Sequence, residues 1–187
     1  MARDFVLTVM SLDRVGIVAD MTAAITRLAG NIDAISQTVM QGYFTIIVTV
    51  HFDEEVNPDA LARAVRESGS PGELEVSVKE RTVMQPKPVV RDAERFILTI
   101  TGPDRKGIIH RITTFLASRN VNLEDLYAYS EGEGFVLIAQ LQVPTGMPIE
   151  RLQMDVEGLW SPGEMRVSLQ HENVFLATNH VDFRREA

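Results

Sequence analysis

The chain contains no cysteine, and this absence excludes several kinds of site together. Without thiols there is no disulfide, no thiolate-bound metal and no cysteine nucleophile. A chain without cysteine also suits a reducing compartment, so we expect a cytoplasmic protein. No apolar run reaches the roughly 20 residues that a membrane span requires, and the N-terminus lacks the apolar core of a signal peptide. We therefore expect no membrane association.

Positive charge is scarce as well. Lysine and arginine number 18 against 26 acidic residues, which gives a formal net charge of −8. A protein that grips a phosphate backbone needs a basic face, so we do not expect direct nucleic-acid binding. The four histidines lack metal-ligand spacing, and no catalytic triad, nucleotide loop or zinc motif is present. The sequence predicts a protein that is not an enzyme and holds neither metal nor cofactor.

What the chain does contain is an internal repeat. Residues 5–52 and 96–143 align without a gap at a constant offset (96 − 5 = 91). The unit is too long for a solenoid repeat and long enough for a small domain. The recurring polar residues are Asp13/Asp104, Arg14/Arg105 and Asn31/Asn122, together with the glycines Gly16/Gly107. Core packing alone does not explain why polar residues recur.

Each half shows the pattern of a strand, a helix, two strands, a helix and a strand. Apolar residues alternate over 5–10, which predicts a strand. Helical spacing over 16–29 predicts a helix that ends at Gly30-Asn31. Asn57-Pro58 predicts the start of a second helix, with Asn as the N-cap. The second half repeats this order.

The fold class expected from this order is α+β, with two ferredoxin-like (βαββαβ) domains in tandem. Each domain would have an antiparallel four-stranded sheet with both helices on one face. We place the first domain at residues 1–84, a linker at 85–94, the second domain at 95–173 and a C-terminal tail at 174–187.

The other face of each sheet should remain open, with Ile47, Val136 and Ile138 pointing there. An open face with apolar residues commonly meets a partner. Alternatively, these residues are only cross-strand neighbours within the sheet.

The loops Asp13–Gly16 and Asp104–Gly107 join the first strand of each half to its first helix. Backbone N–H groups at a helix N-terminus suit a carboxylate, and glycine lets a ligand approach closely. Asn31 and Asn122 begin the next strand, where an amide offers both donors and an acceptor. Together these groups could hold a free amino acid.

A purely structural interpretation of the same residues remains open. The two aspartates would cap their helices, and the two glycines would only permit a turn. The two asparagines would adopt the left-handed conformation that ends a helix. Arg14 and Arg105 would be solvated or paired with a nearby acid.

The stretch Leu12–Val18, followed by Gly30–Ile32, resembles the ACT domain. The stretch Pro103–Ile109, followed by Val121–Leu123, resembles it more closely, since the first copy has Leu12 where Pro103 stands. The resemblance implies a regulatory amino-acid sensor whose sites commonly form between two ACT domains with sheets side by side. The implied ligand-binding residues are Asp13, Arg14, Gly16, Ile17 and Asn31 in the first copy and Asp104, Arg105, Gly107, Ile108 and Asn122 in the second.

A tandem pair without a catalytic domain is similar to the glycine cleavage system transcriptional repressor family. The N-terminal region of formyltetrahydrofolate deformylase is also similar, but its catalytic domain does not follow here. The first family implies a regulator that responds to a small amino acid, glycine or similar, and we expect a homodimer. The acidic net charge favours action through a regulatory protein partner. The alternative is an interaction module without a ligand, docking on an enzyme or transcription factor. If only one copy binds, we expect the second.

Overall fold

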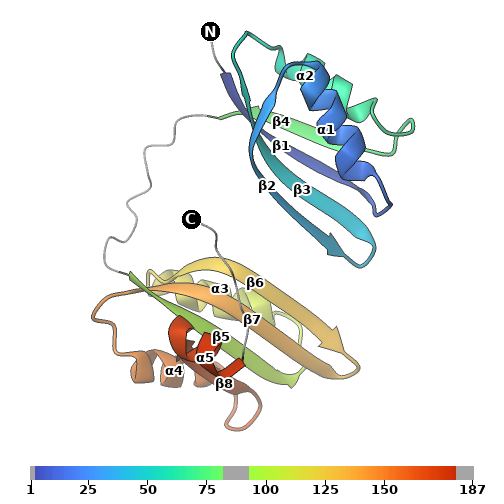
Figure 1. Cartoon of the computed structure of the whole chain (residues 1–187). Helices are drawn as coiled ribbons and strands as arrows, with labels where there is room; N and C mark the ends of the chain where they lie inside the picture. Colours follow the sequence, from blue (N-terminus) through green and yellow to red (C-terminus); the bar gives the residue numbers. More distant parts are fainter. Residues whose placement is uncertain (1–2, 82–92, 180–187) are drawn as a thin grey trace. The chain divides into compact units, whose positions relative to one another are not determined.

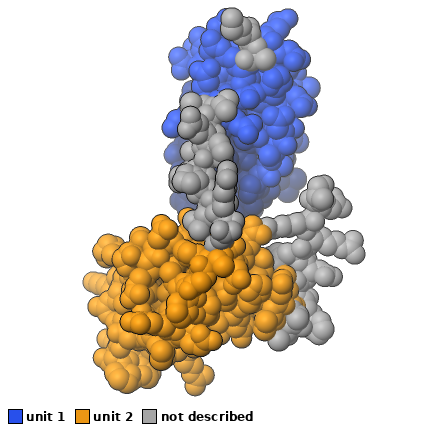
Figure 2. Space-filling view, turned by 90° about the vertical axis from the view of Figure 1, so that its left-hand side faces the viewer, with its two compact units in different colours: residues 1–87 blue, residues 88–187 orange. Residues whose placement is uncertain are grey.

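The computed structural model describes residues 3–81 and 93–179. They belong to two compact units, residues 1–87 and 88–187, which Figure 2 shows in different colours. Most of the predicted linker, 85–94, lies outside the described residues, and its last two residues already belong to a strand that begins at Ala93. The domain limits given above stay a prediction. Among the described residues, no helix is long and apolar enough to cross a membrane.

The first unit is a four-stranded antiparallel sheet with two helices on one side (Figure 1). Its strand order is β2-β3-β1-β4, so β2 and β4 form the edges. Its elements are β1 (Arg3–Leu12), α1 (Ile17–Arg27), β2 (Asn31–Met40), β3 (Tyr43–Phe52), α2 (Pro58–Arg66) and β4 (Glu75–Glu80).

The second unit repeats this topology with strand order β6-β7-β5-β8. Its elements are β5 (Ala93–Pro103), α3 (Ile108–Ser118), β6 (Asn122–Glu131), β7 (Gly134–Pro144), α4 (Ile149–Glu157), β8 (Arg166–His171) and α5 (Glu172–Asn179). The predicted fold class is confirmed: βαββαβ occurs twice, each time as one antiparallel four-stranded sheet with its helices.

Alternating side chains place the core of the first unit between its sheet and its helices. Phe5, Leu7 and Val9 of β1 are buried, and the residues between them point to the other face. Helix α1 contributes Met21 and Ile25, which are also fully buried. The second unit has a separate core of the same kind. Burial on one face fixes the register of the strands, because a slip of one residue would expose every core side chain.

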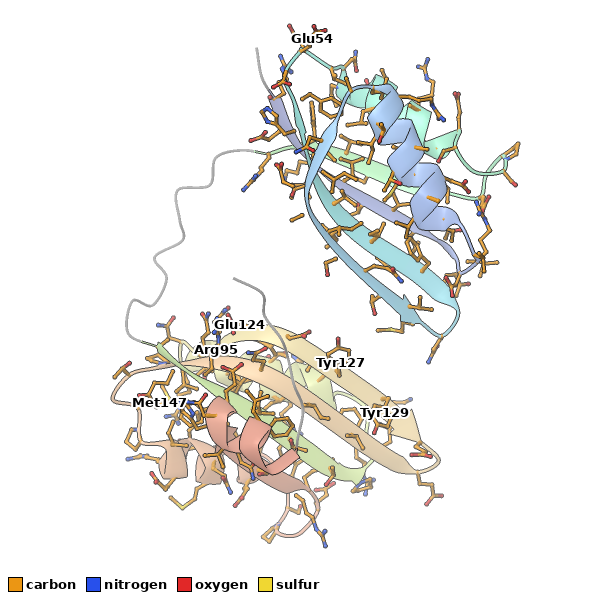
Figure 3. All side chains as sticks on the ribbon, viewed as in Figure 1. Glu54, Arg95, Glu124, Tyr127, Tyr129 and Met147 are labelled. Atoms are coloured by element: carbon orange, nitrogen blue, oxygen red, sulfur yellow. The ribbon has the colours of Figure 1, made fainter. Side chains whose placement is uncertain are left out.

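The face opposite these helices is open in the first unit, as predicted. Ile47 points there and is 49% exposed. In the second unit Val136 and Ile138 point to the equivalent face, where they lie opposite Tyr129 and Tyr127 of β6. These tyrosines are largely exposed (Figure 3). Both interpretations of the apolar residues therefore hold in part, because they are cross-strand neighbours on an accessible face.

Helix α5 was not expected from the sequence, which predicts only a tail beyond residue 173. It contacts β5 and β8 and lies across the face of the sheet opposite to α3 (Figure 1). Gln140 points to this face between two core residues of β7, and its Nε2 donates to Glu172 Oε1 at 2.8 Å. The expected placement of the two plait helices on one face is therefore confirmed in both units, and α5 is an additional helix on the other face of the second sheet. The eight residues of α5 do not separate into an apolar and a polar face, so the sequence pattern did not predict this helix.

One of the two predicted helix ends is correct. Asn57 caps α2, since its side-chain oxygen accepts from the backbone N–H of Asp59 at 2.8 Å. Helix α1, by contrast, ends at Arg27 instead of Gly30-Asn31, and the left-handed residue after it is Ala29, with φ 60°. The reason for glycine at position 30 is close packing.

A Cβ atom on Gly30 would lie 2.7 Å from the Phe52 ring and 2.8 Å from Ile25 Cγ2. The second unit has Val121 and Val143 at the two positions equivalent to Gly30 and Phe52, and both valines are buried. One small and one large residue in the first unit therefore occupy the space of two medium residues in the second.

This exchange of volume predicts coupling between positions 30 and 52. We expect Gly30→Val to overpack the core and Phe52→Val to leave a cavity, each lowering the free energy of unfolding by about 1–3 kcal/mol. The double variant recreates the second unit's pair, so it should be more stable than the sum of the two losses by about 1 kcal/mol. Urea unfolding followed by circular dichroism measures this, and additive losses would contradict the interpretation.

Candidate functional site

Each Asp-Arg-x-Gly loop ends on a glycine in the left-handed conformation. Gly16 has φ 95° and Gly107 has φ 86°, and these residues are the N-caps of α1 and α3. Among the described residues, no side chain caps either helix. The capping interpretation of Asp13 and Asp104 is therefore wrong, whereas the glycines do permit a turn that other residues would strain. The first N–H groups of both helices are left without a capping side chain, at the end where an anion is favoured.

The aspartates instead tie the loops to the neighbouring β-turns. Backbone N–H groups of Asp13 and Asp104 donate to Gly42 O and Glu133 O, both at 2.8 Å. The Asp104 carboxylate also accepts from Ser130 Oγ at 2.8 Å. The first domain has Val39 at the position of Ser130, so only the second domain has this additional support.

The arginines of both loops are paired with glutamates, as the structural interpretation allowed. Arg14 Nε donates to Glu73 Oε1, and Arg105 Nε lies 3.5 Å from Glu164 Oε1. The hydrogen bond from Arg14 lowers the pKa of the Glu73 carboxyl, and the same contact raises the pKa of Arg14. These pairs connect the first loop of each domain to the turn before its last strand.

The sequence contains a signal for these glutamates, although the predicted site does not include them. They end an identical Ser-Pro-Gly-Glu tetrapeptide, at 70–73 and 161–164, with the offset of the repeat (161 − 70 = 91). The second oxygen of each glutamate accepts from the backbone N–H of the serine, at 2.6 Å in the first domain and 3.2 Å in the second. The serine therefore fixes the carboxylate that holds the arginine.

The second loop borders an open hollow of about 300 Å³, at the lower end of the size range of ligand pockets. It is lined by Arg105, Lys106, Gly107, Ile108, Arg111, Trp160 and Glu164. In the first domain, a hollow of about 230 Å³ lies near the end of β1, on a different set of residues. It is lined by Met10, Ser11, Leu12, Tyr43, Gly72, Glu73 and Glu75. Of these two hollows, the one in the second domain is lined by cationic side chains, and the one in the first domain is not.

The structure does not bring the predicted asparagines to the loop of their own domain. Asn31 lies opposite His51, and His51 lies opposite Asp4 near the beginning of β1. The loop follows the other end of β1, so about 30 Å of strand separates the two groups. Asn122 is placed in the same way in the second domain. A single domain therefore offers two half-sites at opposite ends of its sheet.

The structure also gives the backbone conformation of the two asparagines and the burial of the two isoleucines. Asn31 and Asn122 do not adopt the left-handed conformation, which occurs at Ala29 and Asn120 instead. Ile17 and Ile108 are buried in the two cores. Their side chains therefore offer almost no surface to a ligand, although Ile108 is among the residues that line the hollow of the second domain.

The asparagine end of each domain has its own polar network. In the first domain His51 Nδ1 lies 2.6 Å from Asp4 Oδ1, and Asn31 Nδ2 donates to Asp33 Oδ1 at 3.4 Å. In the second domain Asn122 Nδ2 donates to Gln142 Oε1 at 3.4 Å. Gln142 in turn donates to Glu124, which Arg95 holds by an ion pair at 2.9 Å (Figure 3). Within residues 3–81 and 93–179, no group donates a hydrogen bond to the side-chain carbonyl oxygen of either asparagine.

The fold and the loops define a class, that of paired ferredoxin-like domains with a polar loop at the first helix of each. Two family models, each described as an ACT domain, match residues 5–68 and 94–170. The chain therefore belongs to the ACT domain family and contains two ACT domains in tandem.

Curated relatives match about one domain's length of the chain. A UPF0237 protein of Methanosarcina acetivorans is 40% identical over 86 residues, which is 44% of this chain and 91% of that protein. A UPF0237 protein of Streptococcus pneumoniae is 31% identical over 80 residues, 43% of this chain and 91% of that protein. The chain thus belongs with the UPF0237 proteins over this part of its length.

Two solved structures share the complete two-domain fold. An unknown protein from Galdieria sulphuraria has 21% identity and a TM-score of 0.70, covering 91% of this chain and 99% of that chain. A candidate glycine cleavage system transcriptional repressor has 19% identity and a TM-score of 0.65, covering 91% of this chain and 97% of that chain. At these identities the likeness establishes the fold alone.

The histidine beside Asn31 makes the asparagine end of the first domain sensitive to pH. The hydrogen bond to Asp4, followed by that to Asp53, raises the pKa of His51 above its ordinary value of 6.5. A raised pKa in the folded state adds stability that is complete below the unfolded pKa and is lost as pH rises through the folded pKa. Stability of the first domain should therefore decrease with pH in the window just above pH 6.5.

We expect Asp4→Asn to lower the pKa of His51 and to reduce this decrease, because it removes the largest cause of the shift. Titration of the His51 ring protons by NMR measures the pKa, and urea unfolding across the window measures the stability. Asp125→Asn, on the second domain, is the control. A wild-type pKa at the ordinary value would show that the His51–Asp4 contact does not form in solution.

Proposed function

We propose that the chain is a cytoplasmic regulatory protein that binds a small amino acid, glycine or similar, and acts through a protein partner. The observation that supports this most directly is the cationic hollow at the loop Asp104–Gly107. Lys106 and Arg111 line it, and the uncapped N-terminus of α3 opens at the same place. The ligand carboxylate would bind there, since oriented N–H groups and nearby cations favour an anion.

The ammonium group of the ligand needs an acceptor that the same domain does not place near the loop. Strand β6 is an edge strand, so its outer side can pair with another strand. Glu131 at its end lies opposite Gly134, which lies opposite Pro103 just before the loop. Antiparallel pairing of two β6 strands would therefore place Asn122 of one copy beside the loop of the other. A two-fold symmetric homodimer would form two such sites.

Ligand binding would order the loops and thereby favour one arrangement of the paired domains over another. The net charge of −8 supports a protein partner over direct contact with nucleic acid. The two-domain fold shared with a candidate glycine cleavage system transcriptional repressor agrees with a role in gene regulation. The proposed ligand-binding residues remain those of the two loops and the two asparagines, with the second copy as the more favourable one.

A second candidate function is a ligand-independent docking module. The observation that favours it is the open sheet face, where Tyr127 is 61% exposed and Tyr129 is 55% exposed. Large exposed aromatic side chains on one face are typical of a surface that meets another protein. This function requires no amino acid, so measurement of ligand binding separates the two candidates.

The decisive experiment is isothermal titration of the full chain with a panel of amino acids that includes glycine and serine. We expect at least one small amino acid to release heat with saturable binding, and larger side chains to bind more weakly in a hollow of about 300 Å³. If a folded sample binds none of them at millimolar concentrations, the sensor function is wrong and the docking module is favoured.

A single substitution tests where the carboxylate binds. Lys106→Val places the residue of the first copy, Val15, into the second loop. We expect affinity to fall about two- to fivefold, the contribution of one exposed cation near a helix N-terminal anion. Lys79→Val is the matched control, because Lys79 is exposed on β4 of the first domain. Equal effects of the two substitutions would show that the ligand binds elsewhere.

A further inference from the structure

The two ACT domains differ in charge at one position beside the loop. Asp20 lies in the first turn of α1, and its counterpart in α3 is Arg111 (111 − 20 = 91). Arg14 Nη2 donates to Asp20 Oδ2 at 2.8 Å, while Arg14 Nε donates to Glu73. Both carboxylates raise the pKa of the Arg14 guanidinium, Glu73 more strongly than Asp20. The first loop thus holds its arginine between two acids.

The second loop leaves its arginine with one acid. Arg105 lies 3.5 Å from Glu164, and its side chain is 64% exposed against 36% for Arg14. Arg111 cannot pair with Arg105, and its Nη1 donates instead to Leu159 O at 2.8 Å. That hydrogen bond holds Arg111 at the edge of the hollow.

The net charge around the two loops differs in sign as a result. In the first domain, the formal charges of the side chains in and beside the loop sum to −2; these side chains are Asp13, Arg14, Asp20 and Glu73. In the second domain, the formal charges of the corresponding side chains sum to +1; these side chains are Asp104, Arg105, Lys106, Arg111 and Glu164. These charges lie within a Debye length of about 8 Å of their loop, so physiological salt does not cancel the difference. An incoming carboxylate is repelled by the first group and attracted by the second.

We propose that Asp20 closes the loop of the first domain by supplying, from within the chain, the carboxylate that a ligand supplies in the second domain. The inference rests on the proposed function and makes it more specific: one amino acid binds per chain, in the second domain. Asp20 and Arg111 are then the residues that decide which of the two loops accepts a ligand. Val15, which is 98% exposed where the second loop has Lys106, removes a further cation from the first loop.

The closure can be measured without any ligand. Phenylglyoxal modifies arginine, and peptide mapping by mass spectrometry gives the rate at each position of the full chain. We expect Arg105 to react several-fold faster than Arg14, because Arg14 donates to two carboxylates. Asp20→Asn should bring Arg14 close to the rate of Arg105, and Asp20→Glu should retain the protection. Asp59→Asn, an exposed first-turn acid of α2, is the matched control.

Equal rates for Arg14 and Arg105 in the wild type, or an Arg14 rate unchanged by Asp20→Asn, would overturn the closure. Titration with glycine, or with whichever amino acid of the panel binds, gives the second result. We expect one ligand per chain in the wild type and an additional, weaker binding event in Asp20→Asn. Two equal sites in the wild type would also overturn the inference.

A wild type that binds no amino acid would refute the proposed function, and the labelling rates would still decide whether Asp20 occupies the first loop. The reciprocal variant, Arg111→Asp, should protect Arg105 from phenylglyoxal and abolish binding. Because that variant also loses the hydrogen bond to Leu159 O, Asp20→Asn remains the primary test.

Discussion

The ion pair between loop arginine and turn glutamate determines how each domain presents its loop. It connects the first β-to-α connection of the fold to the last connection before the final strand, in both copies of the repeat. An exposed pair of this kind contributes little to stability, because solvent screens the attraction. Its importance is therefore geometric: the glutamate is held by a serine N–H, the arginine by the glutamate, and the glycine after the arginine opens a helix N-terminus.

Duplication of this arrangement allowed its two copies to diverge in charge without a change of fold. Within each core, a change of volume at one position is matched by a change at its neighbour. The first core combines Gly30 with Phe52, and the second has Val121 and Val143 at the same two positions. The loops differ in a way that packing does not require, because Asp20 and Arg111 both lie on the surface side of their helices. Separate roles for the two domains would produce such a difference, because packing does not require it and it lies beside a hollow that is lined by cations in one copy.

The position of the asparagines explains why the proposed site depends on the edge strands. A loop and an asparagine about 30 Å apart in one domain cannot hold a single small ligand. Antiparallel pairing of edge strands removes that separation, because the start of one strand meets the end of the other. An assembly of ACT domains is therefore part of the proposed site, and ligand affinity and assembly would be coupled through the same strands.

The sequence by itself determined the fold class, the duplication and the residues of the two loops, because alternation, helical spacing and a constant offset of 91 depend only on nearby or repeated residues. It also contained the Ser-Pro-Gly-Glu repeat, although its meaning required the partner arginine. Only the tertiary structure decided that Asp13 and Asp104 do not cap, that Ile17 and Ile108 face the core, and that α5 covers part of one sheet. It alone placed Asn31 and Asn122 at the far end from their loops. These facts depend on which strands pair and in which direction, and residues far apart in the chain set that geometry.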